Sequence, residues 1–287
     1  MTHKLAENNV EIYFCVIFYI RNLAKNGKIR YNRYSQKKRR IGMPKFFVEE
    51  NQIQHNTITI TGTDVNHIHH VLRLQKEDTI QITSKQTHIT YHCVIQDITS
   101  EMVICSKIAE QQANHELPFS ITIYQGLPKA EKMEWVIQKC TELGVDAFVP
   151  TILHHCVVKL DTQNAQKKTQ RWQKIAEVAA KQSGRDSIPQ VQMPQTLEQL
   201  GERLADYDAC IVAYEKEEQV TLKQALQQIG EYTKIAIVIG PEGGLEEKEV
   251  QYLRDKGAKV ITLGNRILRT ETVALVITSN IIYDREG

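Results

Sequence analysis

The spacing of hydrophobic positions in this chain changes near residue 119. Before that point, short apolar or alternating runs are separated by turn residues, which is typical of β-strands. We expect strands at 46–48, 57–60, 79–83, 88–95 and 102–108, and one short helix at 64–74. Short strands with a single helix indicate a small barrel or compact sheet. The polar stretch 111–118, which ends in proline, is typical of a linker.

From Phe119 onward, short apolar runs alternate with amphipathic segments of helical period. We expect strands at 121–124, 147–152, 209–213, 235–239 and 260–263. We expect helices at 130–143, 169–182, 221–229 and 246–256, and a last helix from about residue 271. Gly144 stands where a left-handed cap would end the first of these helices. Such regular alternation predicts a mostly parallel sheet with helices on both faces.

The first 42 residues differ in composition from the rest of the chain. They carry ten Lys or Arg and two acids, and their apolar run at 12–20 is too short to span a bilayer. Most of the charge follows that run, and a small-residue cleavage site is not evident, unlike in a signal peptide. We expect Met43 to be the true start and residues 1–42 to be a basic leader from upstream sequence. A basic nucleic-acid arm or a short membrane anchor is the alternative.

Net charge changes the picture once the leader is set apart. The whole chain is +2 and the leader contributes +8, so residues 43–287 sum to −6. Bulk charge therefore does not support nucleic-acid binding, which would have to depend on local patches. The six cysteines are scattered without a C-x-x-C pair, which indicates free thiols in a reducing cytoplasm.

Two loops that follow buried strands carry the strongest chemical signal. One is Gly240-Pro-Glu-Gly-Gly244, and the other runs from Gly264 to Thr272. Ligands of open α/β sheets bind where parallel strands end, so we expect one pocket built from both loops. The first loop lacks the lysine of a phosphate-binding P-loop, and Glu246, Glu247 and Glu249 after it would repel a phosphate. An uncharged or zwitterionic ligand is favoured, and a purely structural turn is the alternative.

Charged and polar side chains in the second loop suggest more than a turn. Arg266 and Arg269 lie beside Glu271, which is typical of an anion-handling site, although solvated surface charge is the alternative. Thr270 is expected to cap the last helix. The segments 129–132 and 182–185 fall at element ends and are expected to be solvated turns that add positive charge.

Histidines cluster at two places, 67–70 and 154–155. Neither cluster has the spacing of three convergent ligands, so no metal site is expected. His67 and His70 are expected on one face of the short helix, with Arg73, Val71 and Leu72 beside them, and a surface contact to RNA or to a protein partner is an equally good interpretation.

Several of these segments resemble one known family. Residues 239–245 and 263–272 are similar to the signature segments of RsmE-type methyltransferases of the SPOUT class, which methylate uridine N3 in 16S ribosomal RNA. The resemblance extends through 126–144, 171–176, 182–185 and 66–73, and so covers about residues 43–287. Two positions depart from the pattern, because Val273 replaces a small residue or threonine and the turn 84–86 lacks Asp-Gly.

The resemblance implies a fold, a cofactor and partners. The fold is a PUA-like β-barrel at 43–113, followed by a SPOUT α/β domain at 118–287 with a C-terminal trefoil knot. The cofactor is S-adenosylmethionine, and the partners are 16S rRNA within the 30S subunit and a second copy in a homodimer, with no membrane and no metal. The implied cofactor-binding residues are Tyr214, Gly240, Glu242, Gly243, Gly244, Leu263, Gly264, Ile267, Leu268, Thr272 and Ala274.

A mechanism follows as a hypothesis. Ionising uridine N3 costs ~3–4 kcal/mol near neutral pH, and Arg269 is expected to stabilise the anion while Glu271 or Glu242 accepts the proton. The expected RNA-binding cations are Arg73, Lys129, Lys132, Arg185 and Arg266. Three other functions stay open: a SPOUT ribose 2′-O-methyltransferase, a non-catalytic RNA-binding module of ribosome assembly, and a nucleotide-binding regulator.

Overall fold

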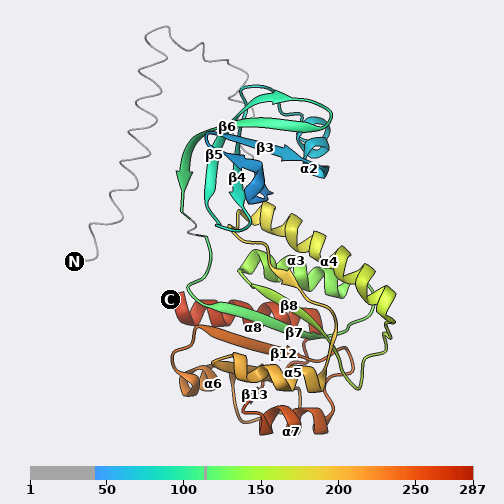
Figure 1. Cartoon of the computed structure of the whole chain (residues 1–287). Helices are drawn as coiled ribbons and strands as arrows, with labels where there is room; N and C mark the ends of the chain where they lie inside the picture. The colour runs from blue at the N-terminus through green and yellow to red at the C-terminus, as the bar shows by residue number, and fades with distance from the viewer. Residues whose placement is uncertain (1–42, 113–114, 287) are drawn as a thin grey trace, which may run out of the picture. The chain divides into compact units, whose positions relative to one another are not determined.

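Two β-sheets, one after the other along the chain, organise the protein from Pro44 onward (Figure 1). The structure is a computed structural model that describes residues 43–112 and 115–286. The interpretation of residues 1–42 as a leader lies outside these described residues. The domain boundaries expected at 43–113 and 118–287 stay a prediction.

The first sheet has six strands in the order β1-β4-β5-β6-β3-β2. Its strands are β1 (Lys45–Val48), β2 (Ile53–Gln54), β3 (Thr57–Thr61), β4 (Thr79–Ser84), β5 (Thr90–Ile98) and β6 (Met102–Gln111). The β1–β4 pair is parallel and the other pairs are antiparallel. Alternate residues such as Ile58, Ile60 and Ile82 point into a common core, which explains why the sheet curls (Figure 1). A compact sheet with one short helical segment agrees with the prediction.

That helical segment differs in form from the expected helix at 64–74. It consists of one α-turn, α2 (Thr63–Asn66), followed by a π-helical turn at His67–Val71. The chain leaves the helix before Arg73, whose φ is +53°, and the Leu74 amide donates to the Ile68 carbonyl at 3.0 Å. The prediction that Arg73 lies beside His67 and His70 on a helix is therefore wrong. Only Val65 and Ile68 are buried there, too few apolar contacts to extend a regular helix.

The second sheet is entirely parallel, in the order β10-β8-β7-β12-β11-β13, with β9 paired to β8. Its strands are β7 (Ser120–Gly126), β8 (Ala147–Ile152), β9 (Gln190–Val191), β10 (Gln195–Thr196), β11 (Ala209–Ala213), β12 (Lys234–Ile239) and β13 (Lys259–Ile261). Its helices are α3 (Lys132–Leu143), α4 (Thr162–Ser183), α5 (Leu197–Arg203), α6 (Leu222–Ile229), α7 (Glu247–Asp255) and α8 (Thr270–Glu286). Helices cover both faces (Figure 1), as the alternating pattern predicted.

Buried strands supply the core on both faces of this sheet. In β12, Ile235 and Ile237 join a cluster with residues of α3, α4, α6 and α8, whereas Ala236 and Val238 face α5 and α7. A strand buried on both sides reads as a continuous apolar run, which is why these strands were predictable. Among the described residues, no helix is long and apolar enough to cross a membrane.

Helix boundaries were harder to predict than strands. Helix α4 begins seven residues before the expected start at 169, because the Asp161 carboxylate accepts from the Asn164 amide at 2.8 Å and caps the helix. Helix α5 was not predicted, although Thr196 and Gln199 form a reciprocal capping box at its start. Gly144 adopts a left-handed conformation with φ +106°, as expected.

A buried polar network joins the start of the first sheet to the segment after α4. Lys45 lies 2.5 Å from Asp186, and both side chains are almost fully buried. Arg185 is 3% exposed and pairs with Glu116 and Asp146. The expectation of a solvated turn at 182–185 is therefore wrong for Arg185, which is too buried to meet RNA at the surface, although Gln182 and Ser183 are exposed.

The electrostatics of Asp186 follow from these contacts. Burial alone would raise its pKa, but the ion pair with Lys45 and the bonds from His115 outweigh it and hold the pKa of that carboxyl well below its usual range. A carboxyl with a lowered pKa stabilises the fold fully above about pH 4, and that contribution is lost as the pH falls further.

We predict that Lys45→Ala lowers the free energy of unfolding by about 3–5 kcal/mol, because it leaves Asp186 buried without its main cation. Urea denaturation at pH 7 measures the change. Lys85→Ala is the matched control, because the Lys85–Glu49 pair is exposed and contributes under about 1 kcal/mol. Equal losses for the two variants would contradict the prediction.

Candidate active site

The carboxyl ends of β11, β12 and β13 meet around one cavity of about 900 Å³. Both glycine-opened loops line it, which is the arrangement their positions predicted. A third wall comes from the segment after β11, including Tyr214 and the acids Glu215, Glu217 and Glu218. The site residues predicted from the sequence that line the cavity are Lys132, Tyr214, Gly240, Glu242, Gly243, Gly244, Leu263, Gly264, Arg266, Ile267, Leu268 and Arg269.

The first loop needs its glycines because Glu215 and His155 pack closely against its backbone. Gly244 has φ +71°, and a Cβ there would lie 2.5 Å from Glu215 Oε1. A Cβ on Gly243 would lie 2.8 Å from the Cβ of His155, which follows β8. The loop therefore presents bare backbone to the cavity, which suits close approach of a ligand.

A buried hydrogen-bond bundle ties this loop to α8 and to β7. The Thr270 hydroxyl donates to the Gly240 carbonyl at 2.6 Å, and Gln125 Nε2 donates to the Thr270 hydroxyl at 2.8 Å. Thr270 was expected to cap the last helix, but its hydroxyl bonds the first loop instead. The sequence pattern did not predict a role for Gln125, because only the tertiary structure shows that this glutamine at the end of β7 is fully buried and hydrogen-bonded.

Three charged side chains meet at the edge of the cavity. Lys132 Nζ lies 2.9 Å from Glu242 Oε1 and 3.8 Å from Glu271 Oε2. Partial burial raises the pKa of Glu242, but the bond from Lys132 and the Lys129 backbone amide outweigh it, so the pKa is lowered. Glu271 Oε2 is buried, and no described residue forms a hydrogen bond with it. The two predicted proton acceptors thus flank one lysine, which had been predicted only as an RNA contact.

The remaining predicted residues lie outside the cavity lining. Ala274 is fully buried in the core behind the cavity and Thr272 is half-buried. Arg73 and Lys129 are exposed, whereas Arg185 belongs to the buried network described above. Whether the cavity residues bind a cofactor, and whether the exposed cations bind RNA, stays a prediction.

After the end of β8, His155 contacts the first loop and His154 contacts α7. His155 Nδ1 lies 3.3 Å from the Gly244 carbonyl, and the His154 amide donates to Glu249 Oε1 at 2.8 Å. Within residues 43–112 and 115–286, no three His, Cys, Asp or Glu side chains are grouped so as to hold a metal ion.

Comparison with known proteins places this geometry in a family. Residues 115–282 match the RNA methyltransferase domain, and residues 60–108 match the RNA methyltransferase PUA domain. The chain belongs to the RNA methyltransferase family. This membership confirms the resemblance that the loop motifs indicated and accounts for two sheets in succession.

Curated relatives are similar to this RNA methyltransferase over more than four fifths of the chain. Ribosomal RNA small subunit methyltransferase E of Bacillus subtilis (strain 168) is 41% identical over 251 residues, which cover 85% of this chain and 98% of that protein. The protein of the same name from Synechocystis sp. is 31% identical over 235 residues, covering 82% of this chain and 75% of the relative.

Solved structures share the fold. The Neisseria gonorrhoeae ribosomal RNA small subunit methyltransferase E, bound to S-adenosylmethionine, is 27% identical with a TM-score of 0.75, covering 84% of this chain and 97% of that one. A Legionella pneumophila protein described as a methyltransferase, also with S-adenosylmethionine bound, is 26% identical with a TM-score of 0.77, covering 85% and 98%.

We predict that Lys132→Met raises the pKa of Glu242, because the change removes the ammonium that lowers it and leaves the effect of burial. A carboxyl-detected NMR titration of the glutamates measures the shift. Lys139→Met is the control, since Lys139 pairs with Glu142 on the exposed side of α3. An unmoved Glu242 titration would show that Lys132 does not set its charge.

Proposed function

We propose that this chain is an S-adenosylmethionine-dependent methyltransferase that methylates N3 of a uridine in 16S rRNA of the small ribosomal subunit. The observation that carries the proposal is the single cavity formed by both signature loops in a chain of the RNA methyltransferase family. Relatives named for small-subunit rRNA methylation support the substrate class.

The cavity residues fit S-adenosylmethionine. The loop at 240–244 offers bare backbone, and a volume of about 900 Å³ accommodates a ligand of that size. Glu215, Glu217 and Glu218 give the third wall negative charge, which suits a cationic, phosphate-free ligand. When bound, S-adenosylmethionine supplies an electrophilic methyl group. Tyr214, the glycine loop and residues 263–268 would hold it, and Thr272 and Ala274 would support the wall from behind.

Arg269 and Glu271 would prepare the uridine. Arg269 lines the cavity, and its guanidinium would stabilise negative charge on a base carbonyl as N3 loses its proton. Glu271 is the better proton acceptor of the two glutamates, because Glu242 is bonded to Lys132 and its lowered pKa makes it a weaker base. Glu242 would keep Lys132 and the glycine loop in place.

A trefoil knot, typical of the SPOUT class, is part of this proposal. The chain passes from β13 at the sheet edge, beside Val220 and Thr221, back to α8, which packs against α3 and β12. Such a return path suits a segment threaded through an earlier loop. We also propose a homodimer in the cytoplasm that acts on the 30S subunit. The exposed apolar side chains Ile267, in the second signature loop, and Tyr283, on α8, support a protein partner at this surface.

The deciding experiment is mass spectrometry of small-subunit rRNA from a strain lacking this gene. We expect 3-methyluridine to disappear, and to return when purified protein and S-adenosylmethionine are added to the isolated subunits. Loss of a 2′-O-methylated nucleoside instead would replace base methylation with ribose methylation. No change in any methylated nucleoside would leave only a binding function.

We predict that Arg269→Ala lowers kcat by about 10²- to 10³-fold, because one charge-assisted contact to the developing anion is lost. Methyl transfer from radiolabelled S-adenosylmethionine to saturating subunits measures kcat. Arg203→Ala is the control, since Arg203 lies on α5 and pairs with Asp206. Unchanged kcat with weaker RNA binding would reassign Arg269 to docking.

A further inference from the structure

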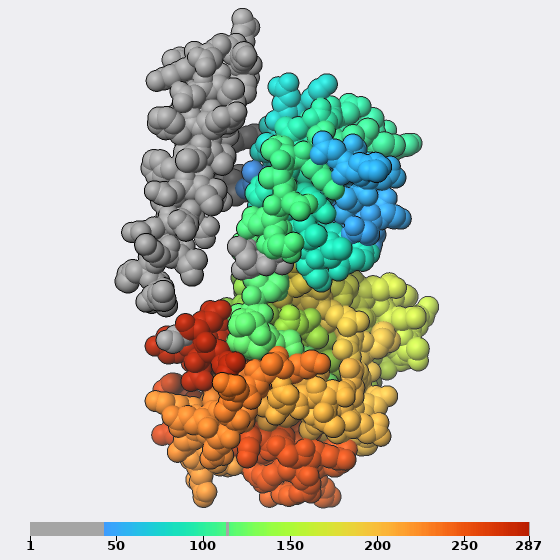
Figure 2. Space-filling model, turned by 60° about the vertical axis from the view of Figure 1, so that its left-hand side comes forward, coloured from blue at the N-terminus to red at the C-terminus, as the bar shows by residue number. Residues whose placement is uncertain are grey.

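Helix α4 carries an unusual concentration of positive charge for this chain. Its 22 residues include five basic side chains and one acid, a net charge of +4, whereas residues 43–287 together sum to −6. Trp172 and Ala176 bury the inner face of the helix against the sheet. Lys167, Lys168, Arg171 and Lys174 are exposed. In the space-filling view, the yellow-green part of the chain that includes α4 reaches the surface (Figure 2).

These cations have few acidic partners of their own. Arg171 pairs with Glu134 at 2.9 Å, and Lys168 lies 5.8 Å from the centre of the Trp172 ring. Within residues 43–112 and 115–286, neither Lys167 nor Lys174 makes an ion pair with a carboxylate. Charge that the protein does not neutralise is available to an anionic partner.

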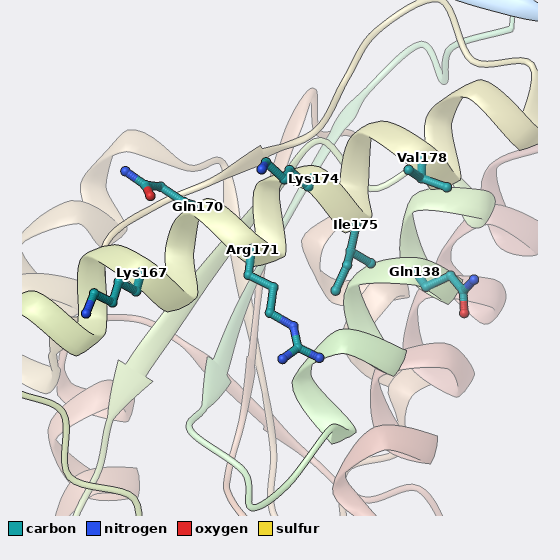
Figure 3. Close-up of a pocket in the computed structure, with 7 residues that line it drawn as sticks. All are labelled: Gln138, Lys167, Gln170, Arg171, Lys174, Ile175 and Val178. Atoms are coloured by element: carbon teal, nitrogen blue, oxygen red, sulfur yellow. The ribbon is translucent and has the colours of Figure 1, made fainter. Parts of the chain in front are cut away.

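A shallow groove of about 500 Å³ runs beside these side chains, between α4 and α3 (Figure 3). Lys167, Arg171 and Lys174 line it together with Gln138, Gln170, Ile175 and Val178. In Figure 3, Lys167, Gln170 and Lys174 project from the outer side of α4, and Arg171 points toward α3. Guanidinium, ammonium and amide groups are the donors that proteins use most often for phosphate and sugar oxygens.

The two ends of α4 lie near different parts of the fold. The helix begins soon after β8, at the edge of the sheet where the cavity lies, and ends beside the first sheet, where Lys181 pairs with Asp64 of α2 at 2.9 Å. Its 22 residues span about 33 Å at 1.5 Å per residue. A strand that reached both the cavity edge and the first sheet would therefore follow this helix.

We propose that the exposed face of α4 formed by Lys167, Arg171 and Lys174, here called the α4 basic face, binds the phosphate backbone of the substrate RNA. The proposal rests on the proposed function and names the surface that the substrate follows away from the cavity. Phosphate contacts of this kind position an RNA without reading its sequence, and they make affinity depend on salt. The α4 basic face thus gives residues 43–287, whose net charge is −6, a local positive surface for RNA.

The test compares two charge-reversal variants of the full-length protein. One is Lys167→Glu with Lys174→Glu. The matched control is Lys223→Glu with Lys248→Glu, two exposed lysines on α6 and α7 that bring the same change in net charge. Binding to small subunits from the strain lacking the gene is measured between 50 and 200 mM KCl. Lys167→Gln with Lys174→Gln repeats the test with neutral side chains.

For the α4 variant we expect the Kd for subunits to rise about tenfold at low salt. The slope of log affinity against log salt should become shallower by about 1.4–1.8, the value for two lost phosphate contacts. KM for subunits should rise while kcat and S-adenosylmethionine binding stay unchanged. The control should keep the wild-type salt slope.

A Kd and salt slope equal to those of the control would overturn the proposal and leave the α4 basic face as solvated charge. A changed oligomeric state in sedimentation, with the salt slope unchanged, would overturn it too and assign the face to a protein contact. Failure of the wild type to methylate any subunit would count against the proposed function instead, while the comparison of Kd values would still decide the RNA surface.

Discussion

The Gly240 carbonyl is the point on which the candidate site depends. It accepts from Thr270 at the start of α8, and Gln125 at the end of β7 donates to the same threonine, with all three groups buried. These bonds connect segments 30 and 145 residues apart in sequence. A buried polar group that loses its partner costs about 1–3 kcal/mol, so the bundle fixes both signature loops at once.

Lys132 lies between two glutamates at the edge of the cavity. Because it bonds Glu242 and approaches Glu271 only to 3.8 Å, the two carboxylates have different surroundings. Glu242 pairs with Lys132 and is held against the loop, whereas Glu271 has a buried oxygen that forms no hydrogen bond within the described part of the chain. Environments that separate two similar groups in this way allow them to take separate roles in acid–base chemistry.

The strands could be read from the sequence because they are buried on both faces. The prediction of β8 and β11 matched their bounds, since continuous apolar runs leave little choice of register. Helix ends were harder, because α4 starts at a cap seven residues outside the apolar pattern. The segment after α2 could not be predicted from propensity, since its π-helical turn depends on how Ile68 and Leu74 fit the core.

The sequence by itself determined the alternation of strands and helices, the two glycine-opened loops and the family they belong to, because these follow from local patterns of residue type. Only the tertiary structure decided which charges face one another. Arg185 and Lys132 are both basic residues at element ends, yet one is buried in a network with Glu116 and Asp146 and the other lies between two glutamates at the cavity. Neighbours distant in sequence set burial and pairing, so no local pattern contains that information.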